Sequence, residues 1–283
     1  KLIREITEAF EACIDASIEF ESAITGVYKT VDGTAEELEA ISNSIKRMAT
    51  EIPATTNEIA AVAEAAGQLG IATEDIISFT EVMINLGVTT NLSADEAATA
   101  LARFSNITGM SAKDYERLGS TIVALGNNFA TTESEITEMA TRLASAGTLA
   151  GLTETEILAL AAAMSSVGIQ ADAGGTAMTQ TLSAIEKAVA SGGESLDQFA
   201  RIAGMTSEEF ADKWKHAPIE AIQAFIAGIG GLEEKGESAT LVLDEMGLSG
   251  IRQSNMLKAL ALASGELSSA VELSSTAWRM NTA

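Results

Sequence analysis

Apolar residues recur every three or four positions along almost the whole chain, which is the spacing of one face of an α-helix. The first thirty residues show the pattern clearly, with glutamates mostly on the other faces; its apolar positions are Leu2, Ile6, Phe10, Cys13, Ile14, Ile18 and Ile24. No run of alternating apolar and polar residues marks a strand, and only two prolines interrupt the pattern. The sequence therefore predicts an all-α fold, a compact multi-helix domain of short capped helices with longer terminal helices.

One stretch of this pattern occurs twice. Residues 76–96 read as a helix, a glycine, a short loop and a new helix start, and residues 136–156 repeat that order. We expect Gly87 and Gly147 to end their helices in the left-handed conformation, which glycine adopts without a Cβ clash. This order of helix, glycine, loop and helix start is typical of an αα-hairpin.

Helix starts are marked by capping boxes, in which a Ser or Thr and a Glu three residues later satisfy each other's backbone donors. The sequence predicts such boxes at Thr34 with Glu37, Ser93 with Glu96, Thr132 with Glu135, Thr153 with Glu156 and Thr206 with Glu209. Each cap contributes about 1 kcal/mol. The boxes thus fix where helices begin more than they fix total stability.

Periodicity, caps and glycines together predict the helix boundaries. The expected helices cover about 1–30, 34–51, 56–66, 73–86, 93–106, 111–126, 132–146, 153–168, 177–190, 196–203, 206–215, 218–229, 237–246, 248–263 and 264–283. Residues 170–176 are expected to form a loop, and Ser191 to Ser195 the most flexible link.

The same signals suggest a division into four parts. Residues 1–30 form an N-terminal amphipathic helix, 31–190 a helical core with the repeated hairpin, 191–263 a smaller helical subdomain and 264–283 a C-terminal helix. Because both ends of the chain fall inside helical patterns, we expect the two terminal helices to continue into a longer polypeptide.

The composition argues against several classes of function and structural feature. The 283 residues carry a net charge of −23, with no cluster of Lys or Arg, and this argues against direct binding to nucleic acid. The single cysteine, Cys13, cannot form an intramolecular disulfide. The longest apolar stretches, 157–169 and 218–232, are shorter than the roughly 20 residues that a membrane span needs.

The residues that could form a metal, nucleotide or calcium site are each better explained by a structural role. His216 is the only histidine and has no ligand partner at metal-site spacing, so we expect a surface or helix-end residue. Gly174-Gly175-Thr176 lacks the lysine of a nucleotide loop and is expected to serve tight turning or close helix packing. Asp172 and Asp244-Glu245 have no calcium-loop spacing around them.

Paired carboxylates and small residues also favour structural roles. The pairs Glu133 with Glu135, Glu154 with Glu156 and Glu208 with Glu209 all fall in the first turns of predicted helices, where the helix dipole favours negative charge. Alanines four apart, Ala140 with Ala144 and Ala159 with Ala163, are typical of a tightly packed core. No serine elbow is present. We therefore predict no catalytic, cofactor-binding or metal residues, no cofactor and no enzyme activity.

Longer stretches carry a family resemblance. Residues 125–140, continuing through 143–153, are similar to the core region of phage tail tape measure proteins of the lactococcal siphophage (TP901) type. Further stretches of the same likeness are 66–71, 79–83, 167–177, 199–205 and 247–252, so that it spans the chain from about Phe20 onward.

The resemblance implies a structural virion component. Proteins of this family are long helical chains that lie in the tail lumen, set tail length while tube protein polymerises around them, and leave ahead of the DNA at ejection. It further implies assembly in the host cytoplasm, and as partners other copies of the chain, as a trimer or hexamer, with tube protein, tail chaperones and baseplate or tip proteins. A ruler should be extended, whereas short capped helices fold back, so we expect a compact module within the tape measure.

Two other interpretations stay open. The chain could be a membrane-active segment that inserts during genome delivery, which liposome leakage with a change in the emission of Trp214 or Trp278 would support. It could instead be a cellular helical scaffold, or the tape measure of a prophage-derived particle such as a tail-like bacteriocin. Neighbouring tube and baseplate genes without a capsid gene would favour the particle.

Overall fold

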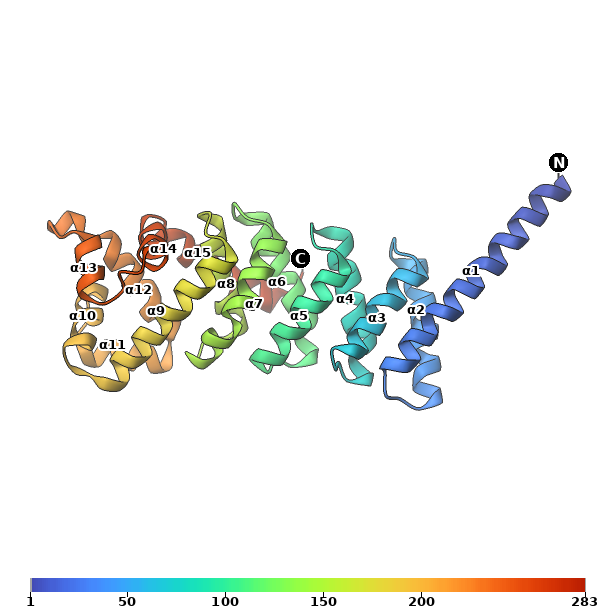
Figure 1. Ribbon diagram of the computed structural model, residues 1–283, viewed down its shortest axis with the longest axis horizontal. Coiled ribbons are helices and arrows are strands. Elements are labelled where there is room, and N and C mark those ends of the chain that lie inside the picture. The colour runs from blue at the N-terminus through green and yellow to red at the C-terminus, as the bar shows by residue number, and fades with distance from the viewer. Residues whose placement is uncertain (1, 283) are drawn as a thin grey trace. The chain divides into compact units, whose positions relative to one another are not determined.

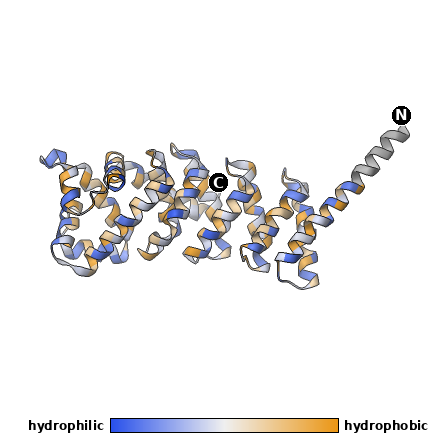
Figure 2. Cartoon of the chain, in the orientation of Figure 1, coloured by the Kyte–Doolittle hydropathy of each residue, from blue (hydrophilic) through white to orange (hydrophobic). Residues whose placement is uncertain are grey.

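A computed structural model describes residues 2–282, with side chains from Ile14 onward, and this part of the chain is all-α, without a strand. Fifteen α-helices occur in it, and three short 3-10 helices. Hydrophilic and hydrophobic residues alternate around nearly every helix in Figure 2, as expected for helices that bury one face. The predicted fold class is confirmed.

The chain folds into two compact units. Unit 1 is the chain up to Arg103 and unit 2 the chain from Phe104 onward, so the boundary lies within helix α5. The sequence places its boundaries elsewhere, at 30/31, 190/191 and 263/264, because glycines and turns mark loops and do not show which helices pack together. The four-part division stays a prediction.

Unit 1 is built on α3. The helices are α1 (Leu2–Thr30), α2 (Ala35–Glu51), α3 (Thr56–Gln68), α4 (Ile76–Thr89) and the first part of α5 (Ala94–Thr108). Both α1 and α2 pack against α3, which also packs against α4. A Cβ on Gly67 would lie 2.9 Å from the carbonyl oxygen of Thr30, so the absence of a side chain there lets α1 approach α3 closely.

Unit 2 contains the remaining helices (Figure 1). They are α6 (Tyr115–Asn128), α7 (Glu133–Leu149), α8 (Glu154–Ser166), α9 (Ala171–Ser191), α10 (Gly193–Ala203), α11 (Ser207–His216), α12 (Pro218–Gly230), α13 (Ala239–Glu245), α14 (Ile251–Leu262) and α15 (Ser264–Met280). Most packing joins helices close in sequence, such as α7 with α8 and α9, and α10 with α12.

The last two helices depart from this local packing, since α14 packs on α9 and α15 packs on α8 and α6. The red helix α15 returns to α8 and α6 (Figure 1), and the Ser274 hydroxyl donates to the carbonyl oxygen of Thr155 at 2.7 Å. In the structure α15 packs within unit 2 as far as Met280, and Asn281 follows it in the left-handed conformation. That the C-terminal helix continues into a longer chain stays a prediction. Its buried residues Leu267, Ala270 and Ala277 explain why it packs back.

The repeated hairpin is present, but its glycines do not end the helices. Gly87 and Gly147 lie inside α4 and α7, neither with positive φ, so that prediction is wrong. A Cβ on Gly87 would lie 2.8 Å from the backbone nitrogen of Ala94, and one on Gly147 would lie 2.8 Å from the side chain of Ile157. Because neither glycine has a side chain, the first turn of the next helix can pack directly against its backbone.

A third copy of this arrangement joins α6 to α7. Gly126 lies six residues before the Thr132 cap, as Gly87 precedes Ser93 and Gly147 precedes Thr153. A Cβ on Gly126 would lie 2.6 Å from the Glu133 side chain. In each of the three copies, a glycine lets two successive helices cross closely, and a cap six residues later begins the second helix.

The predicted loop at 170–176 is also wrong, because α9 begins at Ala171. The Gly174 amide donates to the carbonyl oxygen of Gln170 at 2.8 Å, as in a regular helix. The link predicted at 191–195 is a tight turn, in which Gly192 and Gly193 have φ of 66° and 69°. Left-handed glycines do end several helices, among them Gly109 and Gly204.

All five predicted capping boxes form, and a sixth joins Thr55 to Glu58. At Glu37, Glu58 and Glu209 the bond from the cap backbone N–H, followed by the cap hydroxyl, lowers the pKa of the carboxyl below its ordinary value. At Glu96 the hydroxyl of Ser93 lowers the pKa most, ahead of the backbone bond.

These caps predict a loss of stability in acid. Because the folded pKa lies below the unfolded value of about 4.3, the contribution of the four carboxylates is complete above that pH and lost as pH falls through the folded pKa values. We expect the quadruple substitution E37Q/E58Q/E96Q/E209Q to flatten the fall of the melting temperature between pH 6 and pH 3, since glutamine still accepts the cap bond without titrating.

The control for this experiment replaces four exposed glutamates that bond to no cap, E39Q/E81Q/E138Q/E272Q. It removes the same formal charge, so its acid-dependent loss should stay close to that of the natural chain. Equal flattening in both variants, measured by circular dichroism, would assign the acid sensitivity to net charge and not to the caps.

Candidate functional site

The candidate chemical groups of the sequence lie in structural positions. His216 ends α11 with an exposed side chain, and its Nδ1 lies 2.9 Å from the carbonyl oxygen and 3.2 Å from the carboxylate of Asp212. The predicted helix-end position is confirmed. Among the residues with described side chains, no three His, Cys, Asp or Glu gather as metal ligands. The side chain of Cys13 lies outside that range.

Gly174 and Gly175 serve close helix packing, one of the two predicted uses. A Cβ on Gly175 would lie 2.7 Å from the Arg142 Cβ, and one on Gly174 would lie 3.1 Å from the Met139 methyl group, so α9 touches α7 here. Asp172, singled out beside these glycines, forms an ion pair with Arg142. Its carboxylate thus joins the two helices at the same place.

The paired carboxylates and alanines also have their predicted structural roles. Glu135, Glu156 and Glu209 cap their own helices, and their neighbours lie in the same first turns. Asp244 and Glu245 lie at the end of α13. Ala140 and Ala144 in α7 and Ala159 and Ala163 in α8 are buried where those two helices pack. The absence of catalytic and cofactor residues stays a prediction.

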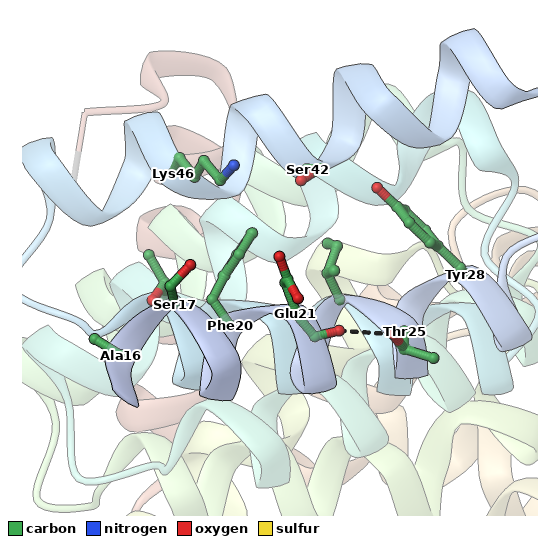
Figure 3. Close-up of a pocket in the computed structure, with 10 residues that line it drawn as sticks. Ala16, Ser17, Phe20, Glu21, Thr25, Tyr28, Ser42 and Lys46 are labelled. Atoms are coloured by element: carbon green, nitrogen blue, oxygen red, sulfur yellow. Dashed lines mark hydrogen bonds between the residues drawn. The ribbon is translucent and has the colours of Figure 1, made fainter. Parts of the chain in front are cut away.

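Unit 1 has a groove of about 670 Å³ between α1 and α2 (Figure 3). Phe20 lies in it with the Lys46 ammonium 4.8 Å from the ring centroid, close enough for a cation–π contact. Tyr28 and Ser42 point into it from the two helices (Figure 3). These contacts bridge α1 and α2, so the groove has a structural use within unit 1.

Unit 2 has two adjoining grooves of about 490 and 470 Å³. The first lies between α7 and α9, and the second continues it to Trp214 and Lys215 of α11. The Trp214 indole donates to the Glu186 carboxylate at 2.6 Å, which ties α11 to α9 beneath this surface. Sequence reasoning missed the surface, because its residues come from three helices and share no motif.

A family model described as phage-related minor tail protein matches residues 42–272, which is most of the chain. The chain belongs to the phage-related minor tail protein family. This minor tail protein is thus a structural component of a phage tail, and the family places it in the virion tail. The matched range begins in α2 and ends in α15, so it takes in helices of both units.

No curated protein and no solved structure matches this minor tail protein. Across the residues that were described, every helix is too short or too polar to cross a lipid bilayer. The resemblance to a phage tail protein, drawn from residues 125–153 and the other stretches, is confirmed at the level of the phage tail.

Proposed function

We propose that this minor tail protein is the core segment of a tape measure protein, which governs tail assembly and length and takes part in genome ejection. The family match over residues 42–272 carries the proposal, together with the collinear resemblance to lactococcal-type tape measures. In this proposal the segment lies in the tail lumen after assembly in the host cytoplasm. Its partners are further copies of itself, as a trimer or hexamer, tube protein, tail chaperones and baseplate or tip proteins.

The packing of the helices supports a folded segment within the tape measure. In unit 2, α7 folds back on α8, and α15 closes on α8 and α6. Glycines at the helix crossings and caps at the helix starts fix these hairpins, and an extended single helix would lose both kinds of contact. We propose that this segment remains compact while other parts of the tape measure extend.

The charge of the segment suits a lumen through which DNA passes. A net charge of −23 repels nucleic acid, because phosphate binding needs Lys and Arg to replace counterions. The same charge would keep the segment from adhering to an acidic channel wall. Neither the protein nor the departing genome would then be held in place by mutual attraction.

An in-frame deletion of Thr34 to Gly265 from the full-length gene tests the proposal by electron microscopy of tails. A fully extended helical ruler rises 1.5 Å per residue and predicts tails shorter by roughly 350 Å. Because the helices fold back, we expect a much smaller change in length, with infectivity lost or tails absent. The substitution G265A, at a glycine with open space around it, serves as the control.

The outcomes separate the parts of the proposal. Shortening by the full helical length would show an extended segment and contradict the compact module. Unchanged length with lost infectivity would assign the segment to ejection, and missing tails would assign it to assembly. Tails that are normal in both length and infectivity would overturn the tape measure function.

A further inference from the structure

The groove of unit 2 runs between two parallel helices. Gly175 of α9 lies against Arg142 of α7, and further along both helices Leu149 and Glu186 line the same groove, so the chains run in the same direction. One wall carries Arg142, Ser145, Ala146, Leu149 and Ala150, and the other Thr179, Leu182, Ser183, Glu186, Lys187 and Ala190. These spacings of three and four residues line up one face of each helix along the groove.

The floor of this groove is apolar and one wall is strongly exposed. Leu182 is buried at the floor beside the small side chains of Ala146 and Ala150. Leu149 borders the groove with 84% of its surface exposed. Together with the apolar floor, Leu149 gives a continuous apolar strip that the apolar face of another helix can cover.

The charged side chains that border the groove favour binding of an acidic partner. Arg142 is paired with Asp172, and the Glu186 carboxylate accepts from Trp214. The exposed Lys187 and Lys215 have no ion-pair partner among the residues with described side chains. In a chain of net charge −23, two lysines without partners beside an apolar groove favour a helix with acidic residues next to its apolar ones.

Helix α1 has such a face. Ile14 and Ile18 lie one helical turn apart and are 45% and 60% exposed. Asp15 and Glu19 follow them directly, and both are exposed. The helix packs on α3 through residues such as Val27, and Glu19 accepts a hydrogen bond from Asn57 of α3, but Ile14 and Ile18 remain exposed to these extents.

We propose that the groove between α7 and α9 of one copy binds helix α1 of a second copy. Ile14 and Ile18 would cover Leu149 and the alanine floor, while Asp15 and Glu19 lie beside the two lysines. The two surfaces differ, so the contact is heterologous and joins one copy to the next. This inference does not depend on the tape measure function, because it concerns the isolated chain.

Sedimentation velocity of the 283-residue chain over a concentration series tests the contact. At physiological ionic strength we expect association that K187E/K215E weakens by about tenfold or more, and D15K/E19K by a similar factor. The chain carrying all four substitutions should recover most of the association, because the two charges are exchanged. L149E should weaken association as well, since it places a carboxylate in the apolar contact.

The control K113E/K235E makes the same charge change at exposed lysines outside the groove, and it should leave association unchanged. All the replaced side chains are exposed, and circular dichroism verifies that each variant folds. A chain that stays monomeric at every concentration would overturn the proposal. So would association that K187E/K215E does not alter, and failure of the four-substitution chain to recover would show that α1 is not the occupant.

Discussion

Replacing Gly228 by alanine should destabilise unit 2 by about 3 kcal/mol, near the upper end for overpacked sites. A Cβ on Gly228 would overlap the backbone carbonyl oxygen of Ile202. Because this neighbour is main chain and not the end of a flexible side chain, α12 and α10 would have to separate. We expect the midpoint of urea denaturation, followed by circular dichroism, to fall with little change in slope.

Gly265 provides the matched control for this substitution. It lies in the first turn of α15, and nothing lies within 4 Å of the position that its Cβ would take. G265A should therefore leave stability unchanged or raise it by up to about 1 kcal/mol, since alanine favours the helix over glycine. If G228A and G265A unfolded at the same urea concentration, the close contact between α10 and α12 would be disproved.

The second large effect is expected at Phe199. Its buried ring lies with its centroid 4.9 Å from that of Phe225 and 6.1 Å from that of Phe210, so it joins α10 to both α12 and α11. F199A should cost about 4 kcal/mol, through lost apolar burial and the cavity left behind. The lost ring contacts contribute to the same effect.

Guanidinium denaturation followed by tryptophan emission measures this effect, because the buried Trp214 lies in α11 next to the cluster. F199L keeps most of the volume and should cost less than about 1.5 kcal/mol. Similar midpoints for F199A and F199L would show that ring contacts and cavity volume do not govern the stability of this part of unit 2.

Helix starts were predictable from the sequence because their determinants are local. A Thr and a Glu three residues apart, as at Thr206 and Glu209, satisfy each other's backbone groups whatever surrounds them. The ends of helices were less predictable, since a glycine serves two purposes. Gly204 ends a helix in the left-handed conformation, whereas Gly147 lies within α7 and makes room for Ile157. That distinction depends on a neighbour which the local sequence does not specify.

The groove of unit 2 depends on tertiary contacts throughout. Leu149 falls between the predicted helices 132–146 and 153–168, and no sequence signal marks Lys187. Only the close approach of α9 to α7 at Gly175 brings the two residues to one surface. The sequence predicts either tight turning or close helix packing for Gly174 and Gly175, and it does not specify which helix is the partner.

The position of α15 also has a consequence during synthesis on the ribosome. Unit 1 and the hairpin of α7 with α8 use contacts between nearby segments, which can form as soon as each segment emerges. The surfaces of α6 and α8 that α15 covers, including the carbonyl group of Thr155, stay open until the chain has been made through Met280. A nascent chain therefore exposes this apolar surface longest, and a chaperone that binds incomplete helical chains would find it there.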